Sequence, residues 1–199
     1  HIAHAEISVV VHLFDAHAQL RLGAFQGEDA LHAEATHRQA CEGEVNDGFL
    51  WETCRLSKNA SAFASVANAA YDAVKGVYPD AIVIMHRSEG QDKSGFEWFL
   101  GTLKSAGVKY DMIGMSLYPS WWDSSKKGYT DWKSYTQSMV SNIGNFYRSY
   151  GKKVMVCEVG MPVSEPEMSA EMLSWLLENT RENEACAGVF YWEPEAPSG

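Results

Sequence analysis

Two glutamates stand in sequence surroundings that suit acid–base or nucleophilic chemistry. Glu158 follows an apolar run in the stretch VMVCEVG (154–160), and Glu44 lies in CEGEVNDGFLW (41–51). A carboxylate at the end of a buried strand costs free energy unless it has partners or a chemical role. Hydrolysis of a glycosidic bond needs two carboxyl groups that flank the scissile bond. We therefore take Glu44 and Glu158 as the candidate catalytic pair, with Glu193 as a rival to Glu44.

The elements that must position these carboxylates alternate regularly from about residue 59. Segments with a helical period of apolar residues alternate with short apolar runs, which are typical of strands buried on both faces. We expect helices over 59–79, 92–107, 130–151 and 165–182, and strands over 81–86, 111–119, 152–160 and 185–194. Such alternation predicts parallel strands joined by right-handed crossovers.

The helix ends and buried faces can also be predicted. Asn59 or Ser61 is expected to cap the first helix, and Gly107 to terminate the second. Pro166 fits the first turn of the fourth helix. The apolar period of the first helix assigns to its buried face Phe63, Val66, Ala70, Val74 and Val77.

The choice between a doubly wound sheet and a barrel depends on the strand ends. A glycine-rich phosphate loop after a strand would favour a doubly wound sheet, and neither GxGxxG nor a P-loop pattern is present. Instead, the four strands end in His86, Tyr118, Glu158 and Trp192. In a β/α barrel the carboxyl ends of the strands form the active-site face. The strand ends therefore favour a barrel with a catalytic rim.

Composition narrows the classes of function. The 199 residues suit one domain with a sizeable core, and a net charge of −10 argues against nucleic acid as a partner. No apolar run approaches the roughly 20 residues of a membrane span. No signal peptide is visible, and the sequence begins with His. Seven Trp and nine Tyr leave two interpretations open, a large aromatic core or platforms that stack on sugar rings.

Five separated motifs carry a resemblance to a known family. GEVNDGFLW (43–51) resembles the NEINNGMLW segment of glycoside hydrolase family 53, the arabinogalactan endo-β-1,4-galactanases. Four further motifs resemble that family's following elements in the same order, so the resemblance covers about residues 43–197: AAYDAVKGVYPDAIVIMH, IGMSLYPSWW, GKKVMVCEVGMPVS and GVFYWEPEA. It implies a (β/α)8 TIM-type barrel and retaining hydrolysis of β-1,4-galactan. Glu44 matches the acid/base at the end of strand four, and Glu158 the nucleophile at the end of strand seven.

Further residues are expected to bind the substrate, a β-1,4-linked galactan or galacto-oligosaccharide. Hydrogen bonds and stacking on sugar faces are their expected contributions, although core packing is an alternative for each tryptophan. The predicted substrate-binding residues are Asn46, Asp47, His86, Tyr118, Trp121 and Trp192. We expect no cofactor and no metal, since the calcium loop of some relatives lies beyond the end of this chain. The resemblance also implies a secreted or periplasmic protein.

Departures from the family pattern limit these expectations. Gly43 stands where the family has an Asn next to the acid/base. Residues 1–42 match nothing in the family, and three further strand–helix units of about 30 residues each would not fit in them. We therefore expect an unassigned segment over 1–42 and an incomplete barrel, containing roughly strands 4 to 8, over 43–199. Its exposed edges would permit self-association.

Two other functions remain open at this point. One is a related barrel β-glycanase that acts on a different β-linked glycan. The other is a carbohydrate-binding remnant that holds glycan without cleaving it, an interpretation that Gly43 and the missing barrel half favour.

Overall fold

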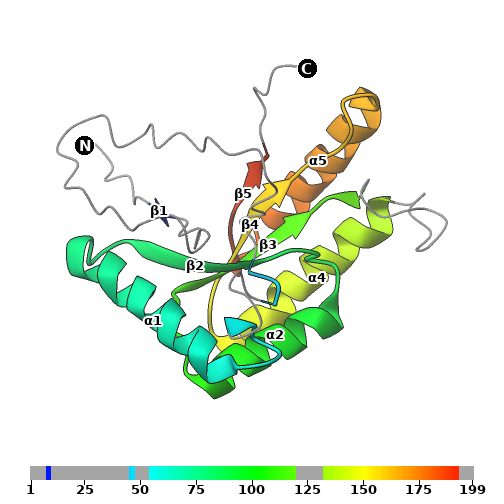
Figure 1. Cartoon of the computed structure of the whole chain (residues 1–199). Coiled ribbons are helices and arrows are strands. Elements are labelled where there is room, and N and C mark those ends of the chain that lie inside the picture. The colour runs from blue at the N-terminus through cyan, green and yellow to red at the C-terminus, as the bar shows by residue number, and fades with distance from the viewer. Residues whose placement is uncertain (1–7, 10–44, 48–53, 120–131, 193–199) are drawn as a thin grey trace, which may run out of the picture.

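The computed structural model describes residues 8–9, 45–47, 54–119 and 132–192 (Figure 1). Strands and helices alternate along the chain as predicted from the sequence. The strands are β1 (Ser8–Val9), β2 (Ile82–Arg87), β3 (Met112–Leu117), β4 (Val154–Val159) and β5 (Cys186–Tyr191). The helices are α1 (Ala60–Val77), α2 (Lys93–Ala106), α4 (Trp132–Tyr150) and α5 (Pro166–Thr180).

The strands form one parallel sheet in the order β1-β2-β3-β4-β5. All four helices pack on the same side of this sheet (Figure 1). The main core contains buried side chains of every helix together with residues from one face of β2, β3 and β4. The other face carries a separate small cluster of Ile84, Met112 and Met155, with no helix residue in it. A doubly wound sheet would have helices on both faces, so this arrangement is part of a (β/α) barrel, as the strand ends predicted.

Local capping explains where the helices begin and end. Asn59, not Ser61, caps α1, and its side-chain oxygen accepts a hydrogen bond from the Ala62 amide at 3.1 Å. Gly107 ends α2 in the left-handed conformation, with a φ of 71°, and its amide bonds the carbonyl of Leu103. Pro166 is the first residue of α5. The N–H that proline lacks would have no partner within the helix at this position, so no helical hydrogen bond is lost.

Helix α2 buries a full apolar stripe, whereas α1 buries only part of the face that its sequence predicted. The aromatic and aliphatic residues Phe96, Phe99, Leu100 and Leu103 of α2 are fully buried, and the Phe96 ring stacks on Phe146 of α4 at 5.4 Å. In α1, however, the predicted face is wrong at Val66 and Val77, which are 39% and 56% exposed. Phe63 of the predicted face is buried as expected, together with Ala64 and Ala67, which were not predicted.

The position of α1 in the helix layer explains this difference. It lies at the end of that layer and packs against α2 on one side (Figure 1). A helix covered from one side buries a narrower stripe than a helix between two neighbours.

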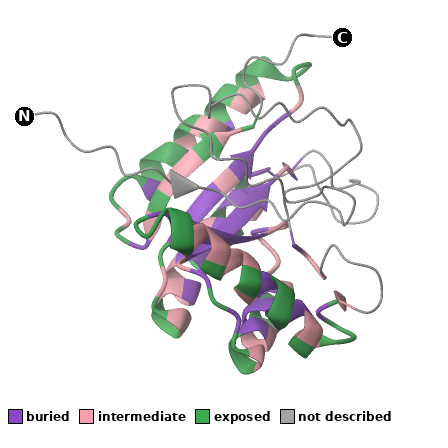
Figure 2. Cartoon of the chain, turned by 60° about the vertical axis from the view of Figure 1, so that its left-hand side comes forward, coloured by how far each residue is buried: buried purple, intermediate pink, exposed green. Residues whose placement is uncertain are grey.

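The strands in the middle of the sheet are buried on both faces, as Figure 2 shows.

One edge of β2 is bonded by two separate segments. Ser8 and Val9 pair with Ile82 and Val83 in the first half of the strand. At its other end, the amide of Val45 donates to the carbonyl of His86 at 2.7 Å. A segment from the family-like part and a segment from residues 1–42 therefore share this edge.

Candidate active site

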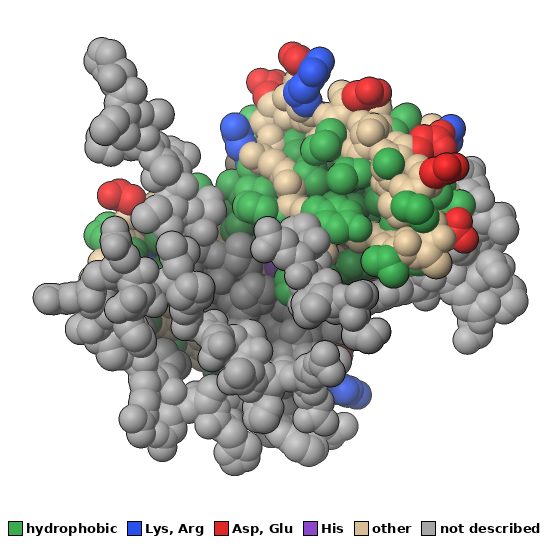
Figure 3. All heavy atoms as spheres, turned by 90° about the horizontal axis from the view of Figure 1, so that it is seen from above, with side chains coloured by type: hydrophobic (Ala, Val, Ile, Leu, Met, Phe, Trp, Pro, Cys, Tyr) green, Lys and Arg blue, Asp and Glu red, His purple; other side chains and the backbone are tan. Residues whose placement is uncertain are grey.

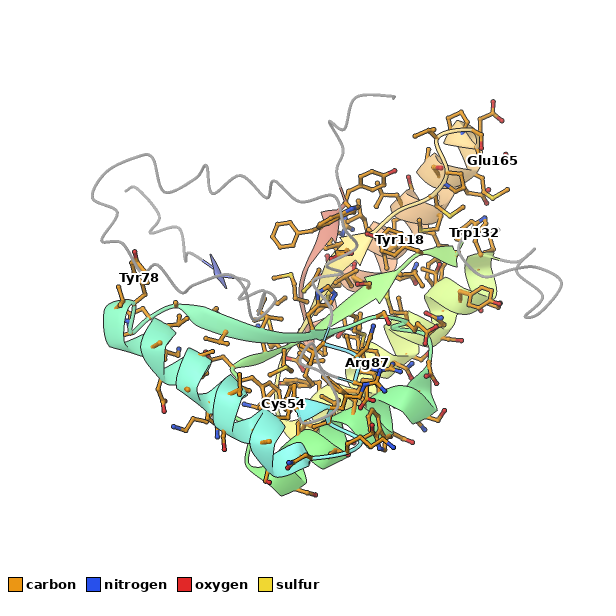
Figure 4. The ribbon with its side chains drawn as sticks, in the orientation of Figure 1. Cys54, Tyr78, Arg87, Tyr118, Trp132 and Glu165 are labelled. Atoms are coloured by element: carbon orange, nitrogen blue, oxygen red, sulfur yellow. The ribbon has the colours of Figure 1, made fainter. Side chains whose placement is uncertain are left out.

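The carboxyl ends of the parallel strands lie together at one end of the sheet, as the strand-end residues predicted. Figure 4 labels Tyr118 where β3 ends, beside β4. Glu158 lies near the end of β4 and is buried, with 6% of its surface exposed. His86 lies near the end of β2 and is 2% exposed. Three of the predicted site residues thus come from three neighbouring strands.

A β-bulge in β4 decides which way Glu158 points. Val156 and Val159 both belong to the helix-side core although they are three residues apart, which a regular alternation does not allow. The register with β3 shifts in between, since Met115 pairs with Val156 and Ser116 pairs with Glu158. One extra residue therefore enters β4 at Cys157.

The extra residue turns Glu158 to the barrel interior. In an unbroken alternation Val156 and Glu158 would share a face, and the carboxylate would point into the apolar layer under the helices. With the bulge it lies on the face of its register neighbour Ser116, away from the main core. Because of the bulge, this apolar strand can end on a carboxylate that is not buried among the apolar side chains of the helix layer.

Tyr118 holds the carboxylate. Its hydroxyl donates a hydrogen bond to Oε2 of Glu158 at 2.8 Å. A hydrogen bond to a carboxylate is charge-assisted and favours the ionised form. An ionised, oriented carboxylate at this position is suited to act as a nucleophile or as a general base.

His86 is tied to β3 by a residue that the sequence did not single out. Nε2 of His86 and the Ser116 hydroxyl lie 2.6 Å apart, and both side chains are buried. Gly114 lies opposite His86 in the register, and a β-carbon there would come within 2.9 Å of the His86 Cβ and 2.8 Å of the Cys157 Sγ. Ser116 and Gly114 therefore hold His86 close to β3.

Asn46 fastens the segment that follows Glu44. Its side-chain oxygen accepts hydrogen bonds from the Ser88 amide at 3.1 Å and from the Ser88 hydroxyl at 2.7 Å. Its φ of 32° lies in the left-handed region, which Asn tolerates better than most residues. The loops after Glu44 and after His86 are thereby joined.

Asp47 makes contacts of the same structural kind. Its two carboxylate oxygens accept hydrogen bonds from the Ser57 amide at 2.7 Å and the Ser57 hydroxyl at 2.6 Å. Substrate binding by Asn46 and Asp47 stays a prediction, and both residues have these intramolecular partners.

Arg87 follows His86, but its side chain contacts α2 and the N-cap of that helix. Its guanidinium lies 5.0 Å from the Phe96 ring centroid and 3.3 Å from Asp92 Oδ2. Figure 4 labels Arg87 at the end of β2, near α2. Partial burial acts to raise the pKa of Asp92, but hydrogen bonds from Gly95 and Ser94 and the charge of Arg87 outweigh it and lower this pKa.

The last strand places an aromatic side chain at the same rim. Trp192 follows β5, and its amide donates to the carbonyl of Val159 at 3.0 Å. The side chain is 45% exposed, which leaves a face open to a ligand. Glu44, Trp121 and Glu193 lie outside the described residues, so the separation between Glu44 and Glu158 stays untested.

Two general features complete the site. Within the ranges that the structure describes, no three His, Cys, Asp or Glu side chains gather as metal ligands. Over those same ranges, none of the helices combines the length and the apolar character that a bilayer crossing requires.

The comparisons with known proteins agree with the fold. The sequence model described as Glycosyl hydrolase family 53 matches residues 39–199. The chain belongs to glycosyl hydrolase family 53. The match begins close to the expected boundary between residues 42 and 43 and includes every predicted site residue.

Individual relatives of the family 53 chain are distant and longer. It is 25% identical over 178 residues to a probable arabinogalactan endo-beta-1,4-galactanase A of Aspergillus terreus, which covers 76% of this chain and 47% of the relative. It is 21% identical to an arabinogalactan endo-beta-1,4-galactanase of Thermothelomyces thermophilus, with 76% and 49% covered. The chain thus spans about half the length of these curated relatives.

Solved structures support the barrel architecture. A structure from a study of two fungal beta-1,4-galactanases matches with a TM-score of 0.62 at 22% identity, covering 76% of this chain and 49% of that one. The GH53 catalytic domain of Ignisphaera aggregans matches with a TM-score of 0.58 at 24% identity, covering 75% and 45%. The family 53 fold therefore extends over about three quarters of the chain.

Proposed function

We propose that this chain carries the two catalytic glutamates of a retaining glycoside hydrolase that cleaves β-1,4-galactan. The observation that carries the proposal is the bulge at Cys157, which turns Glu158 to the barrel interior beside the Tyr118 hydroxyl. Membership of family 53 and the names of the curated galactanases supply the substrate class.

In the proposed mechanism, the ionised carboxylate of Glu158 attacks the anomeric carbon. Glu44, initially protonated, gives its proton to the departing sugar oxygen, and a covalent glycosyl-enzyme forms. Glu44 then takes a proton from water, whose oxygen attacks the anomeric carbon and displaces the Glu158 carboxylate, so the sugar leaves with its anomeric configuration retained. The hydrogen bond from Tyr118 to Oε2 favours the ionised form of Glu158 and orients the carboxylate.

The position of Val45 supports the assignment of Glu44. The Val45 amide bonds the His86 carbonyl, and the next residue, Asn46, bonds Ser88. The chain directly after Glu44 is therefore fastened to the carboxyl end of β2, two strands from Glu158 in the sheet order. Retaining hydrolysis requires about 5–5.5 Å between the two carboxyl groups.

The remaining predicted substrate contacts belong to the same proposal. Trp192 is exposed at the rim and would stack on a galactose face. His86 and Tyr118 would act on sugar hydroxyls or on the carboxylates, and Asn46, Asp47 and Trp121 would line the adjoining positions. The known partners of Asn46 and Asp47, Ser88 and Ser57, would limit their freedom to reach a sugar.

Release of galacto-oligosaccharides from β-1,4-galactan tests the proposal. We expect the chain to release them, and Glu158→Gln to lower the rate on the order of 10³-fold or more, because the amide cannot act as the nucleophile. Proton NMR of the first product should show the β-anomer before it equilibrates. A first product in the α form, or a Glu158→Gln variant as active as the parent, would exclude the mechanism.

A carbohydrate-binding role without catalysis is the second candidate. Gly43 favours it, since the Asn that the family has there would contact the sugar next to the cleaved bond. Binding of galactan without release of sugars, unchanged in Glu158→Gln, would support this role over hydrolysis.

Organisation and location follow from the same family membership. We propose that residues 43–199 form the barrel part and residues 1–42 a separate segment, and that the protein acts outside the cytoplasm. We also propose that β5 allows self-association, because its outer edge has no neighbouring strand in the part of the sheet that the structure describes, and such an edge is a template for another strand.

A further inference from the structure

The glycine two residues after Glu158 lies against the ring of Tyr118. A β-carbon on Gly160 would come within 2.9 Å of the ring atom Cε1 and 3.2 Å of Cδ1. The Gly160 amide also donates to the carbonyl of Leu117, the residue before Tyr118, at 3.2 Å. The backbones of the two loops are thus joined at this point, and the ring occupies the space of the absent side chain.

We propose that Gly160 is a positioning residue, whose missing side chain lets the Tyr118 ring lie where its hydroxyl reaches Glu158. The hydroxyl is at the far end of the ring that Gly160 accommodates, and it donates to Oε2 of Glu158 at 2.8 Å. A methyl group at position 160 would displace the ring edge and so move the hydroxyl away from the carboxylate. The role in catalysis rests on the proposed function of Glu158.

Space, not backbone conformation, is what Gly160 provides. Among the described glycines, the positive φ values belong to Gly107 and Gly151, and Gly160 has none. Alanine therefore adopts the same backbone at position 160 without the penalty of the left-handed region. The atoms that the methyl would meet belong to a side chain, so the ring can give way while the strand pairing is kept.

The test is a double-mutant cycle of Gly160→Ala and Tyr118→Phe, with the titration midpoint of the Glu158 carboxyl as readout. Carbon-13 NMR of side-chain-labelled glutamate follows the midpoint, and the signal is assigned by its loss in Glu158→Gln. We expect Gly160→Ala to raise the midpoint by about one unit, because a hydrogen bond to the ionised form is lost. In the Tyr118→Phe background, Gly160→Ala should change the Glu158 midpoint little.

The other titratable side chains near Glu158 are the same in every protein of the cycle. His86 from β2 and Cys157 from β4 lie on the same interior face, and all four proteins of the cycle keep them. Gly76→Ala is the matched control, since a β-carbon on this α1 glycine meets open space. It should leave the Glu158 midpoint unchanged.

Two outcomes would overturn the inference. One is a folded Gly160→Ala protein with an unchanged midpoint, and the other is an equal shift in the Tyr118→Phe background. If Gly160→Ala does not fold, Tyr118→Ala combined with Gly160→Ala should fold as well as Tyr118→Ala alone, and failure to do so would also overturn it. The titration needs no turnover, so a chain that cleaves no galactan but shows the expected cycle loses the proposed function and keeps this role of Gly160.

Discussion

At the scale of single residues, charged side chains at the two ends of the strands have different surroundings. Asp111 stands just before β3, at the amino end of the sheet, and accepts hydrogen bonds from the Tyr71 hydroxyl and the Val83 amide, both at 2.9 Å. Lys75 Nζ lies 2.9 Å from Oδ2 of Asp111, the oxygen that also accepts from the Val83 amide. In a β/α barrel, residues at the amino end of the strands serve stability, whereas residues at the carboxyl end serve the chemistry.

Asp111 should make stability depend on pH in the acid range. Partial burial acts to raise its pKa, but the bonds from Val83, Lys75 and Tyr71 outweigh this and lower it. Since the folded pKa is below the unfolded value of about 3.9, the contribution is complete above that value and is lost as the pH falls through the folded pKa. We expect Asp111→Asn to cost about 1–2 kcal/mol at pH 7, measured by urea unfolding.

The pH dependence separates this role from a general loss of packing. The difference between the parent and Asp111→Asn should shrink as unfolding is measured below about pH 4. Asp72→Asn is the control, because Asp72 pairs with Lys109 at the surface, where both side chains are about half exposed. That change should cost less than about 0.5 kcal/mol at any pH. A difference for Asp111 that is constant with pH would contradict this account.

At the scale of elements, caps and bulges decide how the chain enters and leaves the sheet. The N-cap of α2 is Asp92, whose Oδ1 accepts from the Gly95 amide and the Ser94 hydroxyl while Oδ2 meets Arg87. We expect Asp92→Ala to destabilise the fold by about 1 kcal/mol, because an amide of the first turn loses its acceptor. Thermal unfolding by circular dichroism measures the effect.

A conservative change distinguishes the cap from the ion pair. Asp92→Asn keeps an oxygen for Gly95 but removes the charge that faces Arg87, so it should retain most of the stability. If Asp92→Asn is as harmful as Asp92→Ala, the contact with Arg87 is the more important one and the capping argument fails.

The elements themselves were predictable from the sequence, whereas some details of the site were not. Periodicity and terminators gave four helices and four strands in the right order, because apolar spacing and capping are local properties. The bulge at Cys157 is not local, since the register of β4 depends on β3 and β5. Simple alternation would have directed Glu158 under the helices, whereas its position at the strand end and in the family motif indicated the site.

The glycines and serines of the site were missed for the same reason. Ser116 and Gly114 acquire their meaning from His86 on the neighbouring strand, and Gly160 from Tyr118. The EVG of the opening motif did contain a signal, a glycine close to a carboxylate. Tyr118, the residue that Gly160 contacts, lies 42 residues earlier in the chain, and no sequence pattern predicts that contact.

At the scale of the whole molecule, the described sheet ends at β5 and leaves apolar side chains uncovered there. Leu177 of α5 and Phe190 of β5 are 46% and 52% exposed, and Trp192 is 45% exposed. Figure 3 looks down on the molecule and shows apolar side chains gathered between charged ones on the described surface. A closed barrel would cover such a strand with its neighbour.

Self-association should therefore depend on concentration and on β5. We expect multi-angle light scattering after size exclusion to give a mass that rises with loading concentration, and Phe190→Asp to shift it toward the monomer. Trp98→Asp is the control, because Trp98 is similarly exposed, at 43%, but belongs to α2. A monomeric mass at every concentration, or an equal effect of both variants, would rule out assembly through this edge.

The pairing of Ser8 and Val9 with β2 has a practical consequence for anyone who wants to produce the barrel part alone. Cloning from residue 43, where the family motifs begin, would discard the only backbone partners that the described chain offers to Ile82 and Val83 on that side. The amino half of β2 would then meet solvent or another molecule. A useful truncation series should keep the first nine residues joined to the rest, or supply a short strand in their place.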